Sequence, residues 1–256
     1  MKYLAMIQAR CGSTRLPNKV MMDLCGKPLL QRVIERVKRS KHIDEVMVIT
    51  SIDKTNLPII SLCAELGIRI GVGSEEDVLD RYYQTAKLIK PEYVIRITAD
   101  CPCIDAGLID YGIEQMTDKI DYCSNTLKET FADGLDFEII KFSALELAWK
   151  EAKHTYEREH VTQYLIHHPE LFEQMCIESS VGDFSNERWT VDEEADYRLI
   201  CEIYKYFVGQ NGNECFNYKD VLGFLNAHND IRSINSGFER NEGLKKSIAE
   251  DKIIGE

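Results

Sequence analysis

The sequence contains no apolar run approaching the ~20 residues that a membrane-spanning helix needs. Residues 1–7 are mostly apolar, but a charge follows at Arg10 before the core of a secretory signal could form. The chain also lacks internal repeats, low-complexity tracts and linkers rich in proline, glycine or serine. We therefore expect a cytoplasmic protein with no membrane partner, folded as a single domain over residues 1–256.

A framework of paired cysteines is missing as well. The nine cysteines are an odd number, and the one tight pair, Cys101 and Cys103, lacks the spacing of a zinc motif. We expect them to be reduced and mostly buried as small apolar side chains. With 44% hydrophobic and 29% charged residues, a chain of 256 residues can bury a sizeable core, which excludes disordered and fibrous proteins.

Positive charge is scarce overall but unevenly distributed. The formal net charge of -12 opposes non-specific binding to nucleic acid, so we expect no nucleic-acid partner. Residues 1–41 nevertheless hold many bases and few acids. Some of these bases belong to the solvated face of a helix, but Arg10, Arg15 and Lys19 come before that helix. They predict a small anion site on an acidic protein.

Hydrophobic periodicity predicts strands that alternate with helices in the first hundred residues. The expected strands are 3–7, 45–50, 69–72 and 93–97, and the expected helices are 28–37, 57–66 and 78–89. Ser74 and Asp77 resemble a capping box before the third of these helices. Because crossovers through helices join parallel strands, this order predicts an α/β fold with a doubly wound, mainly parallel central sheet.

From residue 121 onward the alternation loosens. We expect an extended segment at 135–142, helices at 143–150 and 157–168, a return to the sheet at 188–191, and closing helices at 197–207 and 219–227. The middle of the chain is therefore expected to fold partly away from the sheet, with residues 121–187 as a subregion.

Ligands of open parallel sheets bind beyond the carboxyl ends of the strands, which directs attention to two loops. The first loop, residues 8–19, combines Gly12, small hydroxyl side chains and the three cations. Such a loop can cradle a triphosphate, although it is not a Walker P-loop. The alternative interpretation is a solvated basic loop.

The second loop places Asp100 directly after a buried strand. An acid there either caps the next helix or holds a cation, and Asp105 is better placed as the cap. Asp192 follows another short apolar run and offers a second carboxylate. Each aspartate alone could be structural, but together with a phosphate loop at the same edge they favour a metal–triphosphate site.

A family resemblance becomes visible at these residues. The form Arg-x-Gly-Ser-Thr-Arg-Leu-Pro-x-Lys at 10–19 is similar to that of the cytidylyltransferases, which include the synthetases of CMP-KDO and CMP-sialic acid. Along nearly its whole length the chain resembles the spore-coat polysaccharide biosynthesis group (type F) of this superfamily. The matching segments are 76–82, 96–102, 134–138, 158–162 and 189–192, and residues 26–29 resemble the opening of the sugar-activating nucleotidyltransferases.

The resemblance implies a Rossmann-like nucleotide-diphospho-sugar transferase fold and transfer of CMP from CTP to a sugar or sugar-acid acceptor, in cell-surface or spore-coat polysaccharide biosynthesis. It implies catalytic roles for Arg10, Lys19 and Asp100, and Mg²⁺ on Asp100 and Asp192. The implied nucleotide contacts are Gln8, Ala9, Arg10, Gly12, Ser13, Arg15, Lys19 and Arg81. The implied acceptor contacts are Asn125, Asp136, Glu138, Arg158, Glu159 and His160. A homodimer through the middle segment is expected by analogy.

Some positions depart from the family pattern or allow another interpretation. Asn18 stands where KDO-type enzymes often have glycine, a mild change because asparagine tolerates left-handed backbone. The segment around Asp100 lacks their glycine-aspartate form, which argues against KDO as the acceptor. Asp136 and Glu138 share one face of a strand that could simply be solvated. His160 could instead form a surface ion pair within its helix.

The expected reaction is attack by an acceptor hydroxyl on the α-phosphorus of CTP, in line with departing pyrophosphate. No side chain is an obvious base. Two other functions compete with this one. A GT-A-type glycosyltransferase would consume a nucleotide sugar and usually carries an Asp-x-Asp motif, whereas a catalytically silent subunit would bind nucleotide without turnover.

Overall fold

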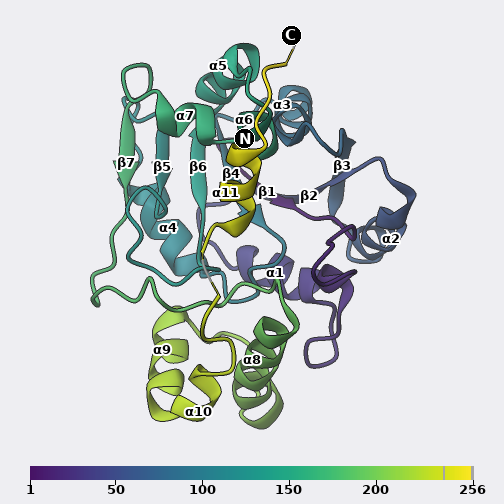
Figure 1. Cartoon of the computed structure of the whole chain (residues 1–256), viewed down its shortest axis with the longest axis vertical. Helices are drawn as coiled ribbons and strands as arrows, with labels where there is room; N and C mark the ends of the chain where they lie inside the picture. Colours follow the sequence, from purple (N-terminus) through teal and green to yellow (C-terminus); the bar gives the residue numbers. More distant parts are fainter. Residues whose placement is uncertain (239, 255–256) are drawn as a thin grey trace.

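A seven-stranded sheet forms the centre of the computed structural model, which describes residues 1–238 and 240–254 (Figure 1). The strand order is β3-β2-β1-β4-β6-β5-β7. Strands β1 to β4 run parallel, whereas β6 is antiparallel to both β4 and β5, and β7 pairs parallel with β5. The strands are β1 (Tyr3–Gln8), β2 (Glu45–Ser51), β3 (Arg69–Gly73), β4 (Tyr93–Thr98), β5 (Tyr122–Ser124), β6 (Glu138–Lys141) and β7 (Gln174–Cys176). The predicted fold class is confirmed.

Helices cover both faces of this sheet. The α-helices are α1 (Leu29–Val37), α2 (Leu57–Glu65), α3 (Val78–Ile89), α4 (Ala106–Gln115), α5 (Phe142–Glu151), α6 (Thr155–Glu159), α7 (Gln163–His167), α8 (Glu194–Tyr204), α9 (Tyr218–Ala227), α10 (Asn229–Arg232) and α11 (Glu242–Ala249). Shorter helical turns are η1 (Lys19–Met21) and η2 (Lys54–Asn56), and a π-helix, η3 (Lys205–Gln210), continues α8. Among the described residues 1–238 and 240–254, no helix combines the length and apolarity needed to cross a membrane.

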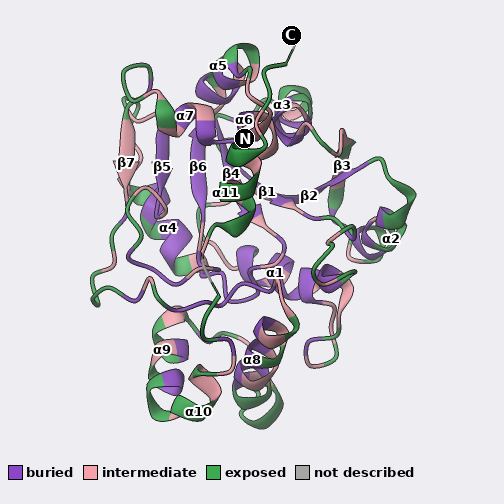
Figure 2. Ribbon diagram, viewed as in Figure 1, coloured by how far each residue is buried: buried purple, intermediate pink, exposed green. Residues whose placement is uncertain are grey.

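The alternation of side chains along each strand produces two separate cores. Ala5 and Ile7 of β1 pack in one core with α1, α4 and α8, whereas Leu4 and Met6 pack in the other with α3 and α5. This is the two-residue period of a strand with both faces buried. The sheet is accordingly drawn almost wholly as buried in Figure 2 at β1, β5 and β6.

The middle of the chain does not leave the sheet as expected. It supplies β5, β6 and β7, three short strands that complete the same sheet beyond β4. Residues 188–191 were predicted to return to the sheet, and that prediction is wrong. Arg188 forms only an isolated bridge with Asp133, because loop contacts hold this segment beside the sheet edge.

Two local predictions also need correction. The helix expected at 157–168 is divided into α6 and α7, because Val161 adopts a left-handed φ of 61° between them. Helix α3 is capped by Asp77, which accepts from the Asp80 amide, and Ser74 only accepts from the Asp77 amide. The expected cap at Asp105 is confirmed, since its side chain accepts from the Leu108 amide at the start of α4.

The C-terminal part of the chain passes through a separate group of helices before returning to the sheet. Helices α8, α9 and α10 pack together at the lower end of the molecule in Figure 1. The yellow segment then runs upward from α10, places α11 beside α6, and ends near α5 and α6. It therefore crosses the region where β1 and β4 end.

Candidate active site

A cavity of about 600 Å³ opens at the carboxyl ends of β1 and β4. The loop after β1 lines it with Gln8, Arg10, Gly12, Ser13, Thr14, Arg15 and Lys19. The loop after β4 adds Thr98, Ala99 and Asp100, and Asp192 comes from the segment before α8. Glu159 and residues of α11 complete the lining. The two loops that the sequence singled out therefore do share one site.

Lys19 joins the two predicted metal ligands. Its ammonium nitrogen lies 2.7 Å from a carboxylate oxygen of Asp100 and 2.7 Å from one of Asp192. The lysine is only 8% exposed, and although burial acts to lower its pKa, the two carboxylates raise it overall. Burial likewise acts to raise the pKa of Asp100, but Lys19 lowers it to about 2. Lys19 and Asp100 therefore stabilise each other's charged forms.

Main-chain contacts bring Asp192 to Asp100. The amide of Val191 donates to the carbonyl oxygen of Asp100 at 2.9 Å, and the hydroxyl of Thr190 donates to the same oxygen at 3.3 Å. These contacts bring the two segments together, whereas we expected residues 188–191 to reach this place as a strand of the sheet. Because they attach 190–192 directly to the second loop, the two carboxylates meet at the rim of the sheet.

A buried arginine that sequence reasoning missed then fixes the Asp192 side chain. Arg188 donates to Asp192 at 2.9 Å, to Asp133 at 2.7 Å and to the fully buried Asp196 at 3.1 Å. Arg188 thus contacts three carboxylates: Asp133 from the segment between β5 and β6, Asp192 from the segment before α8, and Asp196 on α8 itself. The only signal in the sequence was its spacing of four residues from Asp192, which is too common to identify such a role.

The cationic loop after β1 faces this pair of carboxylates. Arg15 lies 3.1 Å from Asp192, 3.5 Å from Glu193 and 3.2 Å from Glu242. Within residues 1–238 and 240–254, Arg10 has no recorded polar partner, although it lines the cavity. An unpaired guanidinium directed at a cavity is suited to an anionic ligand.

The backbone of the same loop is held in a defined shape. The amide of Cys11 donates to the Asn56 side chain at 2.8 Å, and the amide of Asn18 donates to the Cys11 carbonyl at 3.1 Å. Asn18 adopts a left-handed φ of 58°, as its tolerance of this conformation allows. The loop is therefore a structured turn, which argues against the alternative of a freely solvated basic loop.

A smaller hollow of about 100 Å³ adjoins the main cavity. Its lining consists of Gln8, Ala9, Arg10, Val78, Arg81, Arg96, Glu159 and His160. Arg81 is 2% exposed, and burial lowers its pKa. The side-chain oxygen of Gln8 and two guanidinium nitrogens of Arg81 have no hydrogen-bond partner among the described residues. Buried groups left unpaired in this way are available to a polar ligand.

Two of the six predicted acceptor residues reach the site. Glu159 lines both hollows and His160 lines the smaller one. Burial lowers the pKa of His160, and its Nε2 lies 3.0 Å from the hydroxyl of Ser247 on α11. Glu157 is not the ion-pair partner of His160, because Glu157 accepts from the main-chain amides of Lys153 and His154. The Nε2 of His160 instead lies 3.8 Å from the carboxylate of Glu159 at the end of α6.

The other four predicted acceptor residues are tied into the framework, and none of them lines either hollow. Asn125 is fully buried and bonds the main chain of Leu135 and Phe137. Arg158 binds Asp77 at the cap of α3.

Asp136 and Glu138, the two acids predicted to share one face of a strand, both accept hydrogen bonds from neighbouring side chains. Glu138 is 5% exposed and accepts hydrogen bonds from Arg96, Tyr122 and Thr162, so the alternative of a solvated face is wrong for this residue. Asp136 accepts from Arg240 at 2.7 Å. These acids therefore position neighbouring elements around the site.

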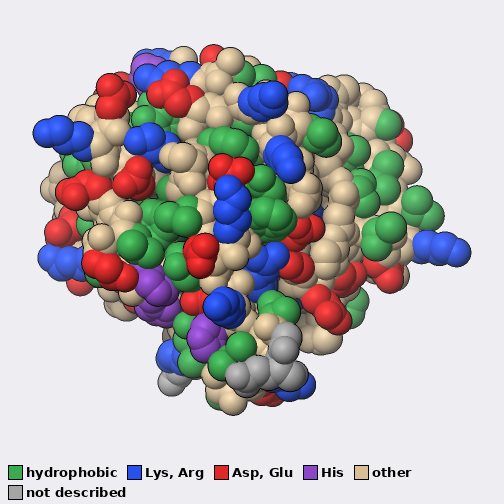
Figure 3. All heavy atoms as spheres, turned by 90° about the horizontal axis from the view of Figure 1, so that it is seen from above, with side chains coloured by type: hydrophobic (Ala, Val, Ile, Leu, Met, Phe, Trp, Pro, Cys, Tyr) green, Lys and Arg blue, Asp and Glu red, His purple; other side chains and the backbone are tan. Residues whose placement is uncertain are grey.

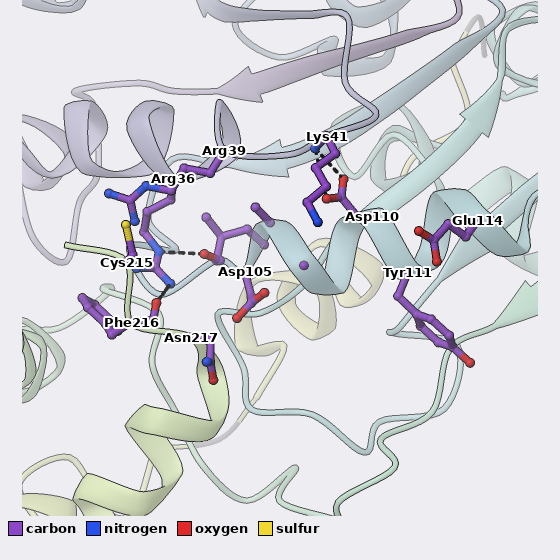
Figure 4. Close-up of a pocket in the computed structure, with 13 residues that line it drawn as sticks. Arg36, Arg39, Lys41, Asp105, Asp110, Tyr111, Glu114, Cys215, Phe216 and Asn217 are labelled. Atoms are coloured by element: carbon purple, nitrogen blue, oxygen red, sulfur yellow. Dashed lines mark hydrogen bonds between the residues drawn. The ribbon is translucent and has the colours of Figure 1, made fainter. Parts of the chain in front are cut away.

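A second cavity, of about 400 Å³, lies between α1, α4 and the segment before α9 (Figure 4). One of its cations, Arg36, donates to the carbonyls of Ile104 and Phe216. Asp110 accepts from the amide of Lys41. Because these charged groups are already engaged, and the predicted site residues lie elsewhere, we do not assign the reaction to this cavity.

A sheet of parallel strands with two carboxylates and a cationic loop at its carboxyl edge defines a nucleotidyltransferase by class. A family model described as cytidylyltransferase matches residues 4–207, and the chain therefore belongs to the cytidylyltransferase family. A cytidylyltransferase moves CMP from CTP to an acceptor. The glycosyltransferase alternative, which would consume a nucleotide sugar, is consequently not favoured.

Individual relatives agree with this assignment. The chain is 38% identical over 238 residues to an uncharacterised protein of Methanocaldococcus jannaschii, covering 92% of this chain and 95% of the relative. It is 33% identical over 208 residues to the spore coat polysaccharide biosynthesis protein SpsF of Bacillus subtilis, covering 79% and 86% respectively. A solved cytidylyltransferase structure from Leptospira borgpetersenii matches with a TM-score of 0.87 at 30% identity, covering 94% of this chain and 100% of that one.

Proposed function

We propose that this cytidylyltransferase transfers CMP to a sugar-acid acceptor in a Mg²⁺-dependent reaction, and that it serves polysaccharide biosynthesis in the cytoplasm. The observation that carries the proposal is the contact of Lys19 with both Asp100 and Asp192, opposite the arginines of the first loop. SpsF, whose printed name refers to spore coat polysaccharide biosynthesis, supports the cellular process.

The chemistry of the two aspartates fits magnesium. One cation, the Lys19 ammonium, already contacts both carboxylates, so a second kind of cation can reach both. The described residues 1–238 and 240–254 contain no cluster of three or more metal-binding side chains. Mg²⁺ commonly takes only one or two protein carboxylates and completes its shell with water and substrate phosphates. When bound, the ion would neutralise charge on the phosphates.

In this proposal the side chains of the first loop bind the phosphates of the nucleotide. Arg10, which has no polar partner among the described residues, binds the phosphates together with Arg15 and the loop at Gly12 and Ser13. Lys19 stabilises the charge that develops on pyrophosphate as the bond to the α-phosphorus breaks. Positioning and charge neutralisation of this kind account for most of the rate enhancement in such transfers.

The smaller hollow is our candidate for the base. Gln8 offers a buried acceptor oxygen and Arg81 offers buried donors, while Ala9 leaves room between them. Cytosine presents an amino donor and ring acceptors, which such a pair of groups can satisfy. We therefore assign Gln8, Ala9 and Arg81 to base recognition.

The acceptor would bind on the side of the cavity formed by Glu159 and His160. Its hydroxyl oxygen attacks the α-phosphorus, its proton passes to solvent or to a basic group of the substrate, and pyrophosphate leaves. Asn125, Asp136, Glu138 and Arg158 take supporting roles, because they hold the elements that surround this side. We further propose a homodimer through residues 121–187, which sedimentation equilibrium would test.

The decisive experiment supplies the four nucleoside triphosphates in turn with a panel of acidic and neutral sugars and Mg²⁺, and measures pyrophosphate. We expect release only with CTP and only with an acidic sugar. A set that includes 3-deoxy-manno-octulosonate also tests whether the altered segment at Asp100 excludes that acceptor. Tight CTP binding without turnover on any acceptor would instead support a silent nucleotide-binding subunit.

A further inference from the structure

The C-terminal helix α11 forms one wall of the active-site cavity. Five of its residues or immediate neighbours line the cavity, at the spacing of one helical face: Glu242, Gly243, Lys246, Ser247 and Glu250. None of them carries an apolar side chain. A helix that packs permanently against a protein usually does so through an apolar stripe, whereas the residues that this helix turns toward the cavity are all polar or glycine.

Both flanks of the helix are anchored to the rest of the chain. On one side Arg240 binds Asp136 at 2.7 Å and the Phe131 carbonyl at 2.9 Å. On the other, Lys252 accepts from the Thr155 amide at 3.0 Å. Between these anchors no residue of α11 is buried, and Figure 2 shows the helix largely as exposed. Elements with so few buried contacts are the ones that move most readily.

Polar contacts connect this helix to residues of the candidate active site. The carboxylate of Glu242 lies 3.2 Å from the Arg15 guanidinium, and the hydroxyl of Ser247 donates to Glu159 at 2.8 Å. Both side chains of the first pair are substantially exposed, at 38% for Arg15 and 47% for Glu242. Exposed ion pairs are weak, so a stronger anion can replace this carboxylate.

This wall lies outside the part of the chain that the family model covers, which ends at residue 207. We propose that α11 is a movable wall of the substrate site. Without nucleotide, Glu242 forms an ion pair with Arg15, and the phosphates of the nucleotide displace Glu242 from it. The inference rests on the proposed role of Arg15 as a phosphate ligand.

The displacement follows from charge. A triphosphate brings several negative charges to a cavity where Arg15 is already shared among Asp192, Glu193 and Glu242. Asp192 is fixed by Arg188, and Glu193 lies next to it in the chain at the start of α8. Glu242 alone of the three belongs to a helix without buried residues. It is therefore the partner that gives way.

Binding of CTP, and separately of inorganic tripolyphosphate, to the full chain by calorimetry tests the proposal. Glu242→Gln should tighten binding of both about twofold to fivefold, because it removes a competitor of exposed-ion-pair strength. Glu250→Gln is the matched control: it removes the same charge from the same wall, but Glu250 has no ion pair with Arg15. It should change the dissociation constant less than twofold. In an Arg15→Ala background the effect of Glu242→Gln should disappear.

Amide exchange across residues 240–250 provides an independent readout. Tripolyphosphate should speed exchange at the start of α11, and unchanged or slower exchange would overturn the displacement. Equal effects of Glu242→Gln and Glu250→Gln on affinity would also overturn it. Failure of the wild-type chain to bind CTP under any condition would contradict the proposed function instead, and tripolyphosphate would still report on the helix.

Discussion

The main-chain amide of Val191 donates a hydrogen bond of 2.9 Å to the carbonyl oxygen of Asp100. Together with the bond from the Thr190 hydroxyl to the same oxygen, this contact joins two loop segments, since residues 188–191 form no strand. It places Asp192 next to Asp100, where Lys19 contacts both carboxylates. The catalytic arrangement thus depends on loop-to-loop bonding at the rim of the sheet.

Removing one of these carboxylates should abolish most turnover. We expect Asp100→Asn to lower kcat at least ~10²-fold, the scale lost with one preorganised electrostatic contact. Pyrophosphate release measures this loss. Asp192→Asn should behave alike, whereas Glu193→Gln, which touches only Arg15 among these groups, should stay within about fivefold. Near-normal activity of Asp100→Asn would refute its role.

Much of this arrangement could be read from the sequence because it depends on local patterns. Strands β1 to β4 and helices α1 to α3 have clear periodicity, and the crossover rule then fixes a parallel sheet. The positions of Asp100 and Lys19 follow, since ligands bind beyond the carboxyl ends of such strands. The cap at Asp105 was also predictable from its side chain.

The remainder depends on contacts between distant segments, which one sequence does not display. Strands β5 and β7 span three residues each, too few for a two-residue period to be recognised. The role of Arg188 requires Asp133 and Asp196 to converge in space. Helix α11 covers the cavity with a polar face, and a polar face looks like an ordinary solvated one in sequence.

The free guanidinium of Arg10 provides a second test. Arg10→Ala should weaken CTP binding about tenfold to a hundredfold, the strength of one hydrogen bond to a charged group. Stability to urea should not change, because Arg10 has no recorded partner within the described residues to lose. Calorimetric titration with CTP measures the first effect. Arg69→Ala, at the far edge strand β3, is the control and should leave affinity unaltered.

Arg188 should matter first for stability. Arg188→Ala leaves the fully buried Asp196 and the nearby Asp133 without their cation, and breaking a buried pair in this way costs about 3–5 kcal/mol. Urea denaturation followed by circular dichroism measures the loss. Arg198→Ala changes an exposed arginine on α8, the helix that carries Asp196, and should cost under ~0.5 kcal/mol. Similar losses in both variants would contradict the role of Arg188.

His160 should make the protein less stable in mild acid. Burial lowers its pKa in the folded state, with Arg96 and Arg10 acting in the same direction and Glu159 opposing them. The unfolded chain, with a histidine pKa of about 6.5, then binds the proton more readily. The free energy of unfolding therefore falls as the pH drops through that value. His160→Asn should reduce this pH-dependent decrease in the free energy of unfolding, measured by urea titration. His42→Asn, at an exposed site, should not change it.

Gly134 should tolerate no side chain, because the loop that carries Asp133 passes against the segment before Asp192. A Cβ at this position would lie 2.5 Å from the Thr190 nitrogen and 2.6 Å from the Trp189 carbonyl carbon, and its φ is 108°. Gly182 is a matched control, since it has a similar φ of 105° but open space around its Cβ.

Both alanine variants therefore bear the backbone strain, about 1–3 kcal/mol, but only Gly134→Ala adds a clash with main chain that cannot rotate away. We expect Gly134→Ala to lose at least ~1–3 kcal/mol more than Gly182→Ala in thermal or urea unfolding. It should also lower pyrophosphate release at temperatures where it remains folded, because separating 133–135 from 189–190 moves Asp192 away from Asp100. Equal stability of the two variants would show that this close approach does not hold the site together.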